Sequence, residues 1–221
     1  MKRIPTRELL DTDSGTPAEI AASLADLRRV NRWFGGISTT QWMIELVAEV
    51  VGKSFLSLLE VAAGSGDVPH MVRERLQRRG ITLEVTLLDR APSHIRDHTR
   101  ALSADALAIP LRDASFDLVG CGLFAHHLNP GEFVQFVQEA LRVCRIAVLI
   151  NDLVRDPIHL AMVYSGYPLY HSRLTRHDAP ASVRQAYTPE EMREMLKQTG
   201  AARVEISRHY LFRMGVIAWK V

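Results

Sequence analysis

The stretch Ser54–Asp67 constrains this chain most, because a short apolar run leads straight into a loop with two glycines. It reads S-F-L-S-L-L-E-V-A-A-G-S-G-D. Apolar residues then recur at helical spacing from Val68 to Leu76, and Gly80 stands where that helix should stop. We therefore expect a buried strand, a tight turn and a helix, the opening unit of an open α/β sheet. Glycines at such a turn allow a ligand to lie against bare backbone, where a Cβ atom would collide.

The same loop favours a ligand without phosphates. From Gly64 it reads G-S-G-D-V-P, so the third glycine of the dinucleotide fingerprint G-x-G-x-x-G is missing. Asp67 places a carboxylate where a pyrophosphate would lie, and like charges repel. A phosphate-cradling G-x-x-x-x-G-K-[ST] sequence is also absent. The next apolar run ends at Asp89, an acid placed to accept hydrogen bonds from ribose hydroxyls. A nucleoside without phosphates fits these residues better than a dinucleotide.

Three successive segments carry a resemblance to a known family. They read E-V-A-A-G-S-G-D at 60–67, L-L-D-R at 87–90 and A-D-A-L-A-I-P-L-R-D-A-S-F-D-L-V at 104–119. Over Phe55–Leu149 the chain resembles the class I S-adenosylmethionine-dependent methyltransferases, in particular those of ubiquinone and menaquinone biosynthesis and their small-molecule relatives. The C-terminal half is similar to methyltransferases of polyketide-type gene clusters. One departure is Ala62, where the family pattern usually has a glycine.

The resemblance implies S-adenosyl-L-methionine as the cofactor and assigns residues to its three parts. The methionine part would be held by Glu60, Ala62, Gly64 and Gly66, the ribose by Asp89, and the adenine by Asp105 with the backbone of Ala106, and Arg90 is a further cofactor-binding candidate. The alternative interpretation is that the two aspartates are solvated loop acids. Their positions favour ligand binding, because each follows an apolar run at the carboxyl end of an expected strand.

The implied fold is Rossmann-like α/β, with a seven-stranded, mostly parallel sheet, helices on both faces and an antiparallel last strand. The third strand is expected at Ala101–Asp105, and the final pair of strands at Val204–Leu211 and Met214–Val221. Two helices should precede the first strand, the first beginning at the capping sequence T-P-A-E of 16–19. We expect residues 1–53 to form an N-terminal helical cap or lid and residues 54–221 the cofactor-binding domain. Between those two helices, Trp33 and Phe34 are either lid residues or ordinary packing against the core.

Composition narrows the class of protein. The 221 residues suffice for one α/β domain with a small appendage, and 27 basic residues against 25 acidic ones do not favour a nucleic-acid partner. Cys121 and Cys144 are too few for a disulfide framework and are expected to be reduced, buried thiols. No apolar run reaches the ~20 residues of a membrane span, so a cytoplasmic location is expected. The chain does not distinguish a monomer from a homodimer.

Four residues are candidates for proton transfer. Methyl transfer to a hydroxyl requires a base, and histidine has a suitable pKa. His126 and His127 follow the fourth expected strand, and Asp152 ends the fifth, both at the carboxyl edge of the sheet. His177 beside an aspartate offers a second acid–base pair. For each, the alternative is a packing, capping or solvated role. We expect no metal ligands.

The segment at about 156–187 is expected to form a substrate lid, since it is longer than a simple connection requires. Its candidate substrate contacts are Tyr164, Tyr170, His171 and Arg173. Aromatic and apolar walls favour a flat, lipophilic small-molecule acceptor. O-methylation of a phenolic or polyketide-like acceptor is favoured over C-methylation of a quinone-type ring.

Three other functions are compatible with parts of the sequence. An RNA methyltransferase would use the basic residues of the lid segment for phosphates, but there is no separate basic domain. A non-catalytic cofactor binder would accommodate the departure at Ala62. A nicotinamide oxidoreductase is disfavoured by Asp67 and by Pro69 in place of the last glycine of its fingerprint.

Overall fold

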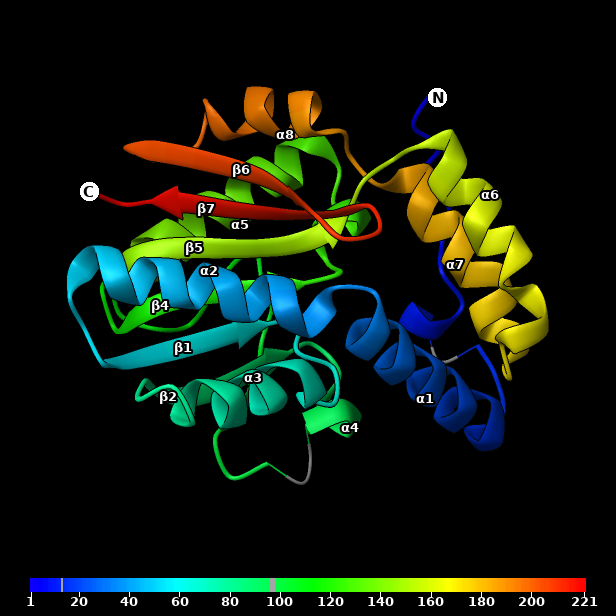
Figure 1. Cartoon of the computed structure of the whole chain (residues 1–221), viewed down its shortest axis with the longest axis horizontal. Coiled ribbons are helices and arrows are strands. Elements are labelled where there is room, and N and C mark those ends of the chain that lie inside the picture. Colours follow the sequence, from blue (N-terminus) through cyan, green and yellow to red (C-terminus); the bar gives the residue numbers. More distant parts are fainter. Residues whose placement is uncertain (13, 96–97) are drawn as a thin grey trace.

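The computed structural model describes residues 1–12, 14–95 and 98–221. Its centre is a seven-stranded sheet in the order β3-β2-β1-β4-β5-β7-β6 (Figure 1). The strands are β1 (Phe55–Val61), β2 (Thr82–Asp89), β3 (Ala101–Ser103), β4 (Phe116–Gly122), β5 (Cys144–Leu153), β6 (Arg203–His209) and β7 (Arg213–Trp219). Only β7 runs antiparallel to its neighbours, β5 and β6. The expected fold class is therefore confirmed, including the antiparallel last strand.

Helices cover both faces of this sheet, as an open α/β sheet requires. On one face lie α2 (Gly36–Val51) and α3 (Asp67–Gln77), and on the other α5 (Pro130–Val143) and α8 (Pro189–Leu196). The two apolar clusters of the core lie on the two faces, one around Phe133 and Phe136 and the other around Ile44 and Leu56. The connection after β2 contains the short helix α4 (Pro92–Ile95).

A separate group of helices lies beyond the carboxyl ends of the parallel strands (Figure 1). It consists of α1 (Pro17–Trp33), α6 (Pro157–Ser165) and α7 (Arg173–Gln185), with the 3-10 turns η1 (Leu10–Thr12) and η3 (Tyr167–Leu169). The buried carboxylate of Asp26 in α1 accepts hydrogen bonds from the backbone N–H groups of His171 (2.9 Å) and Ser172 (3.1 Å) at the start of α7. The N-terminal helix α1 and the segment 156–187 thus form one layer over the sheet edge.

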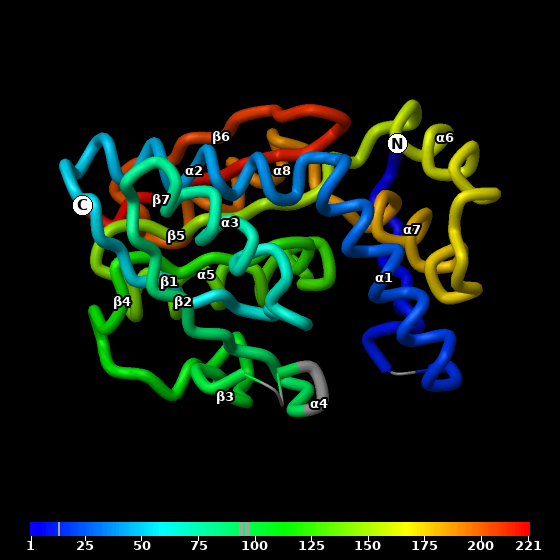
Figure 2. Tube along the Cα trace, turned by 60° about the horizontal axis from the view of Figure 1, so that its bottom comes forward, coloured from blue at the N-terminus to red at the C-terminus, as the bar shows by residue number. Residues whose placement is uncertain are grey.

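The N-terminal segment runs along α7 (Figure 2). The Arg3 guanidinium donates hydrogen bonds to the carbonyls of Gln185 (2.7 Å), His126 (3.0 Å) and Leu128 (3.0 Å), the latter two in and after the turn η2 (Ala125–His127). Its guanidinium also lies 4.2 Å from the centre of the Tyr187 ring. Residues ahead of α1 are therefore fixed beside the loop that follows β4.

Several expected boundaries were wrong by a few residues. The third strand ends at Ser103 rather than Asp105, and β6 and β7 end at His209 and Trp219 rather than Leu211 and Val221. Residues 173–185 form a regular helix, which the sequence analysis treated only as part of a lid. The alternative prediction that Trp33 and Phe34 pack against the core is also wrong, because the two residues are 68% and 41% exposed. Both cysteines are buried free thiols, as expected. Among the described residues, no helix has the length and apolar character needed to cross a bilayer.

Candidate active site

The loop after β1 has a backbone suited to a ligand. Ala62, Gly64 and Gly66 have φ angles of 53°, 53° and 69°, in the left-handed region that glycine adopts most readily. A Cβ atom on Gly66 would lie 2.6 Å from Leu87 Cδ1, whereas one on Gly64 would meet nothing within 4 Å. Gly66 is thus required by close packing against β2, while Gly64 borders open space. Ala62 has a positive φ, which explains why the family pattern usually has a glycine at this position.

Glu60, near the end of β1, is a buried carboxyl facing β4. Its side chain lies beside Gly120, where a Cβ atom would come within 2.7 Å of Oε2. Burial raises the pKa of Glu60 to about 8, because its charged form is poorly solvated between the two strands. A cationic ligand group beside it would favour the ionised form.

Asp89 links the end of β2 to the glycine loop. Its carboxylate accepts hydrogen bonds from the backbone N–H groups of Gly64 (2.8 Å) and Ala91 (2.9 Å). Arg90 is exposed next to it. Asp105 is exposed and accepts a hydrogen bond from the Leu107 backbone N–H (2.9 Å), while Ala106 is buried. The expected cofactor residues therefore lie at the carboxyl ends of β1, β2 and β3.

A buried acid–base pair lies at the neighbouring carboxyl ends of β4 and β5. His126 in η2 and Asp152 in β5 are 2% and 1% exposed, and His126 Nδ1 is 2.6 Å from Asp152 Oδ1. The backbone N–H of His126 donates to the other carboxylate oxygen (3.0 Å). Burial alone would lower the pKa of His126, but the carboxylates of Asp152 and Glu8 raise it to about 10. Burial opposes ionisation of Asp152 as well, yet His126 holds the pKa of Asp152 below its ordinary value.

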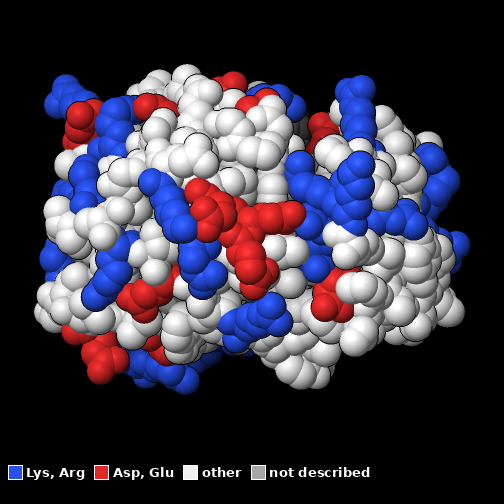
Figure 3. All heavy atoms as spheres, turned by 90° about the horizontal axis from the view of Figure 1, so that it is seen from above, with Lys and Arg blue, Asp and Glu red and all other residues white. Residues whose placement is uncertain are grey.

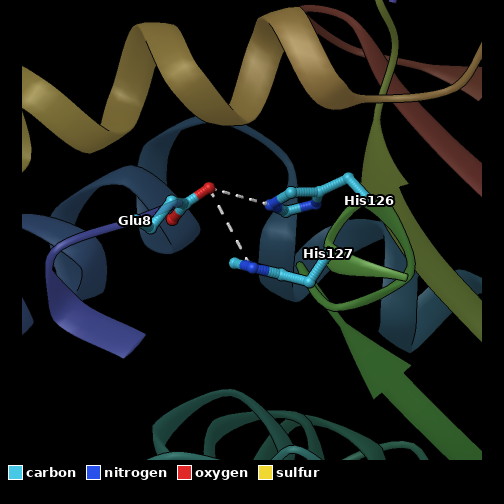
Figure 4. Close-up of side chains that lie close together, drawn as sticks. All are labelled: Glu8, His126 and His127. Carbon is cyan, nitrogen blue, oxygen red and sulfur yellow. Dashed lines mark ion pairs between the residues drawn. The ribbon is translucent and has the colours of Figure 1, made fainter. Parts of the chain in front are cut away.

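Glu8 belongs to this cluster although it lies far away in the sequence (Figure 4). Its Oε1 atom lies 3.5 Å from His126 Nε2 and 3.9 Å from His127 Nε2. The same oxygen accepts hydrogen bonds from Ser182 (2.6 Å) and Gln185 (2.7 Å) of α7. The sequence analysis missed Glu8, since an acid in a polar N-terminal segment has no spacing or periodicity that relates it to residue 126.

The other sequence candidates lie elsewhere in the helical layer. His177 is about half exposed on α7 and pairs with Asp178 (2.8 Å), whose carboxylate accepts hydrogen bonds from the backbone of Leu9 and Leu10. Arg173 pairs with Glu19 of α1 (3.0 Å). These contacts attach α7 to α1 and to the N-terminal segment.

The aromatic residues of the lid form a chain of ring contacts. The ring centres of Tyr164 and Tyr167 are 5.2 Å apart, and those of Tyr167 and Tyr170 are 5.9 Å apart. His171 follows and lies within 2.6 Å of an Arg29 nitrogen. His171 is the sequence candidate that also lines a cavity.

That cavity, of about 580 Å³, lies between α1 and the start of α3, next to the glycine loop. Apolar side chains line it together with three arginines and one aspartate. The lining residues are Ala22, Ala25, Arg28, Arg29, Asn31, Arg32, Ile37, Asp67, Val68, Met71 and His171. Arg28 lies 3.6 Å from Asp67, which directly follows Gly66. The cavity therefore adjoins the first turn of the helix that the glycine loop introduces.

Comparison with known proteins agrees with this arrangement. Residues 58–146 match the family described as a methyltransferase domain. A methyltransferase described as S-adenosylmethionine-dependent, from Aquifex aeolicus, shares 18% identity over 75% of this chain and 82% of its own, with a TM-score of 0.54. The plantazolicin methyltransferase BpumL, solved with S-adenosylhomocysteine, shares 13% identity over 96% and 93% of the two chains, with a TM-score of 0.72. The CMeT domain of the citrinin polyketide synthase shares 14% identity over 74% of this chain and 46% of that one, with a TM-score of 0.55. No curated protein matches the sequence.

The fold and the position of the glycine loop after β1 are those expected of a class I methyltransferase. Residues 58–146 match a methyltransferase domain, and over most of its length the chain shares the fold of solved S-adenosylmethionine-dependent methyltransferases.

Proposed function

We propose that this enzyme transfers the methyl group of S-adenosylmethionine to a hydroxyl of a small aromatic or polyketide-like acceptor. The buried pair of His126 and Asp152 is the observation that carries this proposal. A hydroxyl acceptor must lose a proton during methyl transfer, and His126 would take it up at Nε2 once its own proton, which Asp152 and Glu8 hold in place, has been released. The pair lies at the carboxyl end of β4, the strand next to β1 and its glycine loop.

In this proposal the cofactor lies across the carboxyl ends of the first strands. Glu60 would hold the ammonium group of its methionine part, and Gly64 and Gly66, with Ala62, would allow close backbone approach. Asp89 with Arg90 would contact the ribose, and Asp105 with Ala106 the adenine. Binding energy and exclusion of water, rather than covalent catalysis, would then bring the acceptor into line with the sulfonium.

The acceptor would enter beneath the helical layer, with residues 1–53, apart from α2 on the sheet face, acting as a cap and residues 156–187 as a lid. The apolar and arginine side chains that line the 580 Å³ cavity suit a flat acceptor with acidic or phenolic groups. Two structural neighbours are named for plantazolicin and for a polyketide synthase, which supports a small-molecule acceptor. The face seen in Figure 3 carries acidic and basic side chains side by side, rather than the continuous basic surface that an RNA substrate favours.

The test has two stages. Calorimetry should first detect S-adenosylhomocysteine binding, which NADH does not reproduce. The protein is then incubated with labelled S-adenosylmethionine and a panel of phenols, hydroxylated polyketides, quinols with a free ring carbon, and RNA. Label should enter a hydroxyl of a phenolic or polyketide acceptor, as identified by mass spectrometry. Exclusive transfer to a ring carbon or to RNA would overturn the proposed acceptor, and cofactor binding without any transfer would favour a non-catalytic binder.

A further inference from the structure

Three side chains with the donor atoms of a metal site converge at the carboxyl end of β4 (Figure 4). Glu8 comes from the N-terminal segment, and His126 and His127 come from η2. One ligand atom from each lies within 4.8 Å of the other two. The sequence does not indicate this set, because Glu8 is remote from the two histidines along the chain.

The distances in this cluster suit coordination better than hydrogen bonding. Glu8 Oε1 lies 3.5 Å from His126 Nε2 and 3.9 Å from His127 Nε2. Ordinary hydrogen bonds to nitrogen span roughly 2.7–3.2 Å. Ligand atoms about 2.0–2.2 Å from a tetrahedral ion lie about 3.3–3.6 Å from one another. Glu8 and His126 already have this spacing, whereas the His127 ring would have to move closer to both before all three could bind one ion.

His126 has a buried ring nitrogen directed at the same point. Its Nε2 atom makes no hydrogen bond among the described residues, although the side chain is only 2% exposed, and its nearest acceptor, Glu8 Oε1, lies 3.5 Å away at ion-pair distance. A buried polar atom without a partner is costly, and such an atom calls for an explanation, for example an ion. This observation is independent of the spacing of the ligands.

Each of the three side chains is also held by an outer partner, as metal ligands generally are. His126 Nδ1 pairs with Asp152 (2.6 Å), and His127 Nδ1 pairs with Asp11 (2.9 Å). A carboxylate at Nδ1 leaves Nε2 free to bind an ion and increases its basicity. Hydroxyl and amide donors from α7 fix the Glu8 carboxylate in turn.

We propose that Glu8, His126 and His127 bind one divalent transition-metal ion of the zinc class. Two imidazoles and one carboxylate favour such an ion over magnesium or calcium, which prefer oxygen ligands. Three protein ligands leave a coordination position open, and partial exposure of His127 gives access to it. The ion-binding site rests on this geometry alone. Its use to lower the pKa of a bound acceptor hydroxyl rests on the proposed function.

The experiment titrates the metal-free full-length protein with Co²⁺, followed by visible absorbance, and with Zn²⁺, followed by calorimetry. One ion should bind per chain, with the intense visible bands of low-coordinate Co²⁺. Glu8→Gln and His127→Gln should each weaken binding by about 100-fold, and Asp152→Asn by about 10- to 100-fold. The matched controls are Glu190→Gln and His171→Gln, which remove an exposed acid and an exposed histidine outside the cluster and should leave binding unchanged.

Circular dichroism and S-adenosylhomocysteine affinity are measured on every variant. Variants that keep the fold and bind the cofactor show that any loss of metal is local to the cluster. The metal site is overturned if the folded wild type binds no Co²⁺ or Zn²⁺, or if the two ligand variants bind as tightly as the controls. Failure of methyl transfer with intact metal binding would instead contradict only the proposed function.

Discussion

Asp152 and His126 meet through two hydrogen bonds, one to the ring Nδ1 at 2.6 Å and one to the backbone N–H at 3.0 Å. The carboxylate therefore fixes both the imidazole and the turn that carries it, at a point where both residues are buried. In this pair the end of β5 determines the position of the loop after β4. The arrangement joins the proposed proton-transfer and metal-binding roles of the cluster to the stability of the sheet edge.

Asp152→Ala should destabilise the protein markedly. It leaves the His126 ring buried without its carboxylate, and removing one partner of a buried pair typically costs about 3–5 kcal/mol. Urea denaturation of wild type and variant in the presence of EDTA measures the difference. Asp11→Ala is the matched control, since this acid pairs with His127 but is 44% exposed, and it should cost less than about 1 kcal/mol. Equal losses in the two variants would contradict the importance of the buried pair.

Glu60→Gln should stabilise the cofactor-free protein increasingly as pH rises. Burial raises the pKa of Glu60 from 4.5 to about 8, so the fold favours the neutral form. Wild type therefore has full stability below about pH 4.5 and loses part of it as pH rises toward 8, by an amount on the order of 2–4 kcal/mol. The glutamine variant lacks this loss. The unfolding free energies of wild type and Glu60→Gln, measured from pH 5 to 9, give the size of this loss.

Glu60→Gln should also weaken cofactor binding, because a neutral amide replaces the carboxylate that is the proposed partner of the methionine ammonium group. We expect S-adenosylhomocysteine to bind at least about tenfold more weakly, measured by calorimetry at pH 8. Glu45→Gln, on α2 where the carboxylate pairs with Arg79, is the control and should leave affinity unchanged. Unchanged affinity in Glu60→Gln would remove this residue from the proposed cofactor site.

Gly66→Ala and Gly64→Ala should affect different properties. A methyl group at position 66 meets Leu87 at 2.6 Å in a left-handed backbone, so stability should fall by about 2 kcal/mol or more. At position 64 the methyl group enters open space, and the backbone conformation costs about 1 kcal/mol. The main effect of Gly64→Ala should then be weaker cofactor binding. Thermal unfolding with and without S-adenosylhomocysteine separates the two effects, and equal loss of stability in both variants would contradict this assignment.

Ala62→Gly should stabilise the loop. Ala62 has a φ of 53°. This backbone conformation costs about 1 kcal/mol for a residue with a Cβ atom, whereas glycine adopts it without this steric cost. The greater freedom of glycine in the unfolded chain offsets part of the gain, leaving about 0.5 kcal/mol. Ala63→Gly is the neighbouring control and should be slightly destabilising. A variant with glycine at 62 that unfolds more readily than wild type would show that the backbone angle carries no strain.

Arg213→Met should loosen the helical cap. This arginine is 1% exposed and joins β7 to the Phe34 carbonyl (3.0 Å) and to Asn31 (2.9 Å) at the end of α1. Burial lowers its pKa to about 10. Loss of these bonds should cost about 2–4 kcal/mol and speed amide exchange in α1. The exposed Arg208 on β6 provides the control Arg208→Met, which should change neither quantity.

Local sequence determined much of this protein. The strand, glycine loop and helix of 54–77, the capping sequences at Thr16, Asn129 and Thr188, and the acids at the strand ends are all local patterns, because they depend on neighbouring side chains and backbone groups. Those patterns, with the family resemblance, were enough to predict the sheet and the cofactor class. Asp152 was recognisable as a candidate because parallel strands bring their carboxyl ends to one edge.

Only the tertiary structure decided which candidates meet. Hydrogen bonds that Ser182 and Gln185 of α7 donate to Glu8 hold it beside His126. His177 in the same helix pairs instead with Asp178, whose carboxylate accepts a hydrogen bond from the Leu9 backbone and so anchors the N-terminal segment. Asp26, in what the sequence presents as an amphipathic helix, is buried because it binds the start of α7. Such contacts join residues more than a hundred positions apart, and local periodicity contains no information about them. The physical reason is that they depend on how whole helices pack, which the entire core determines.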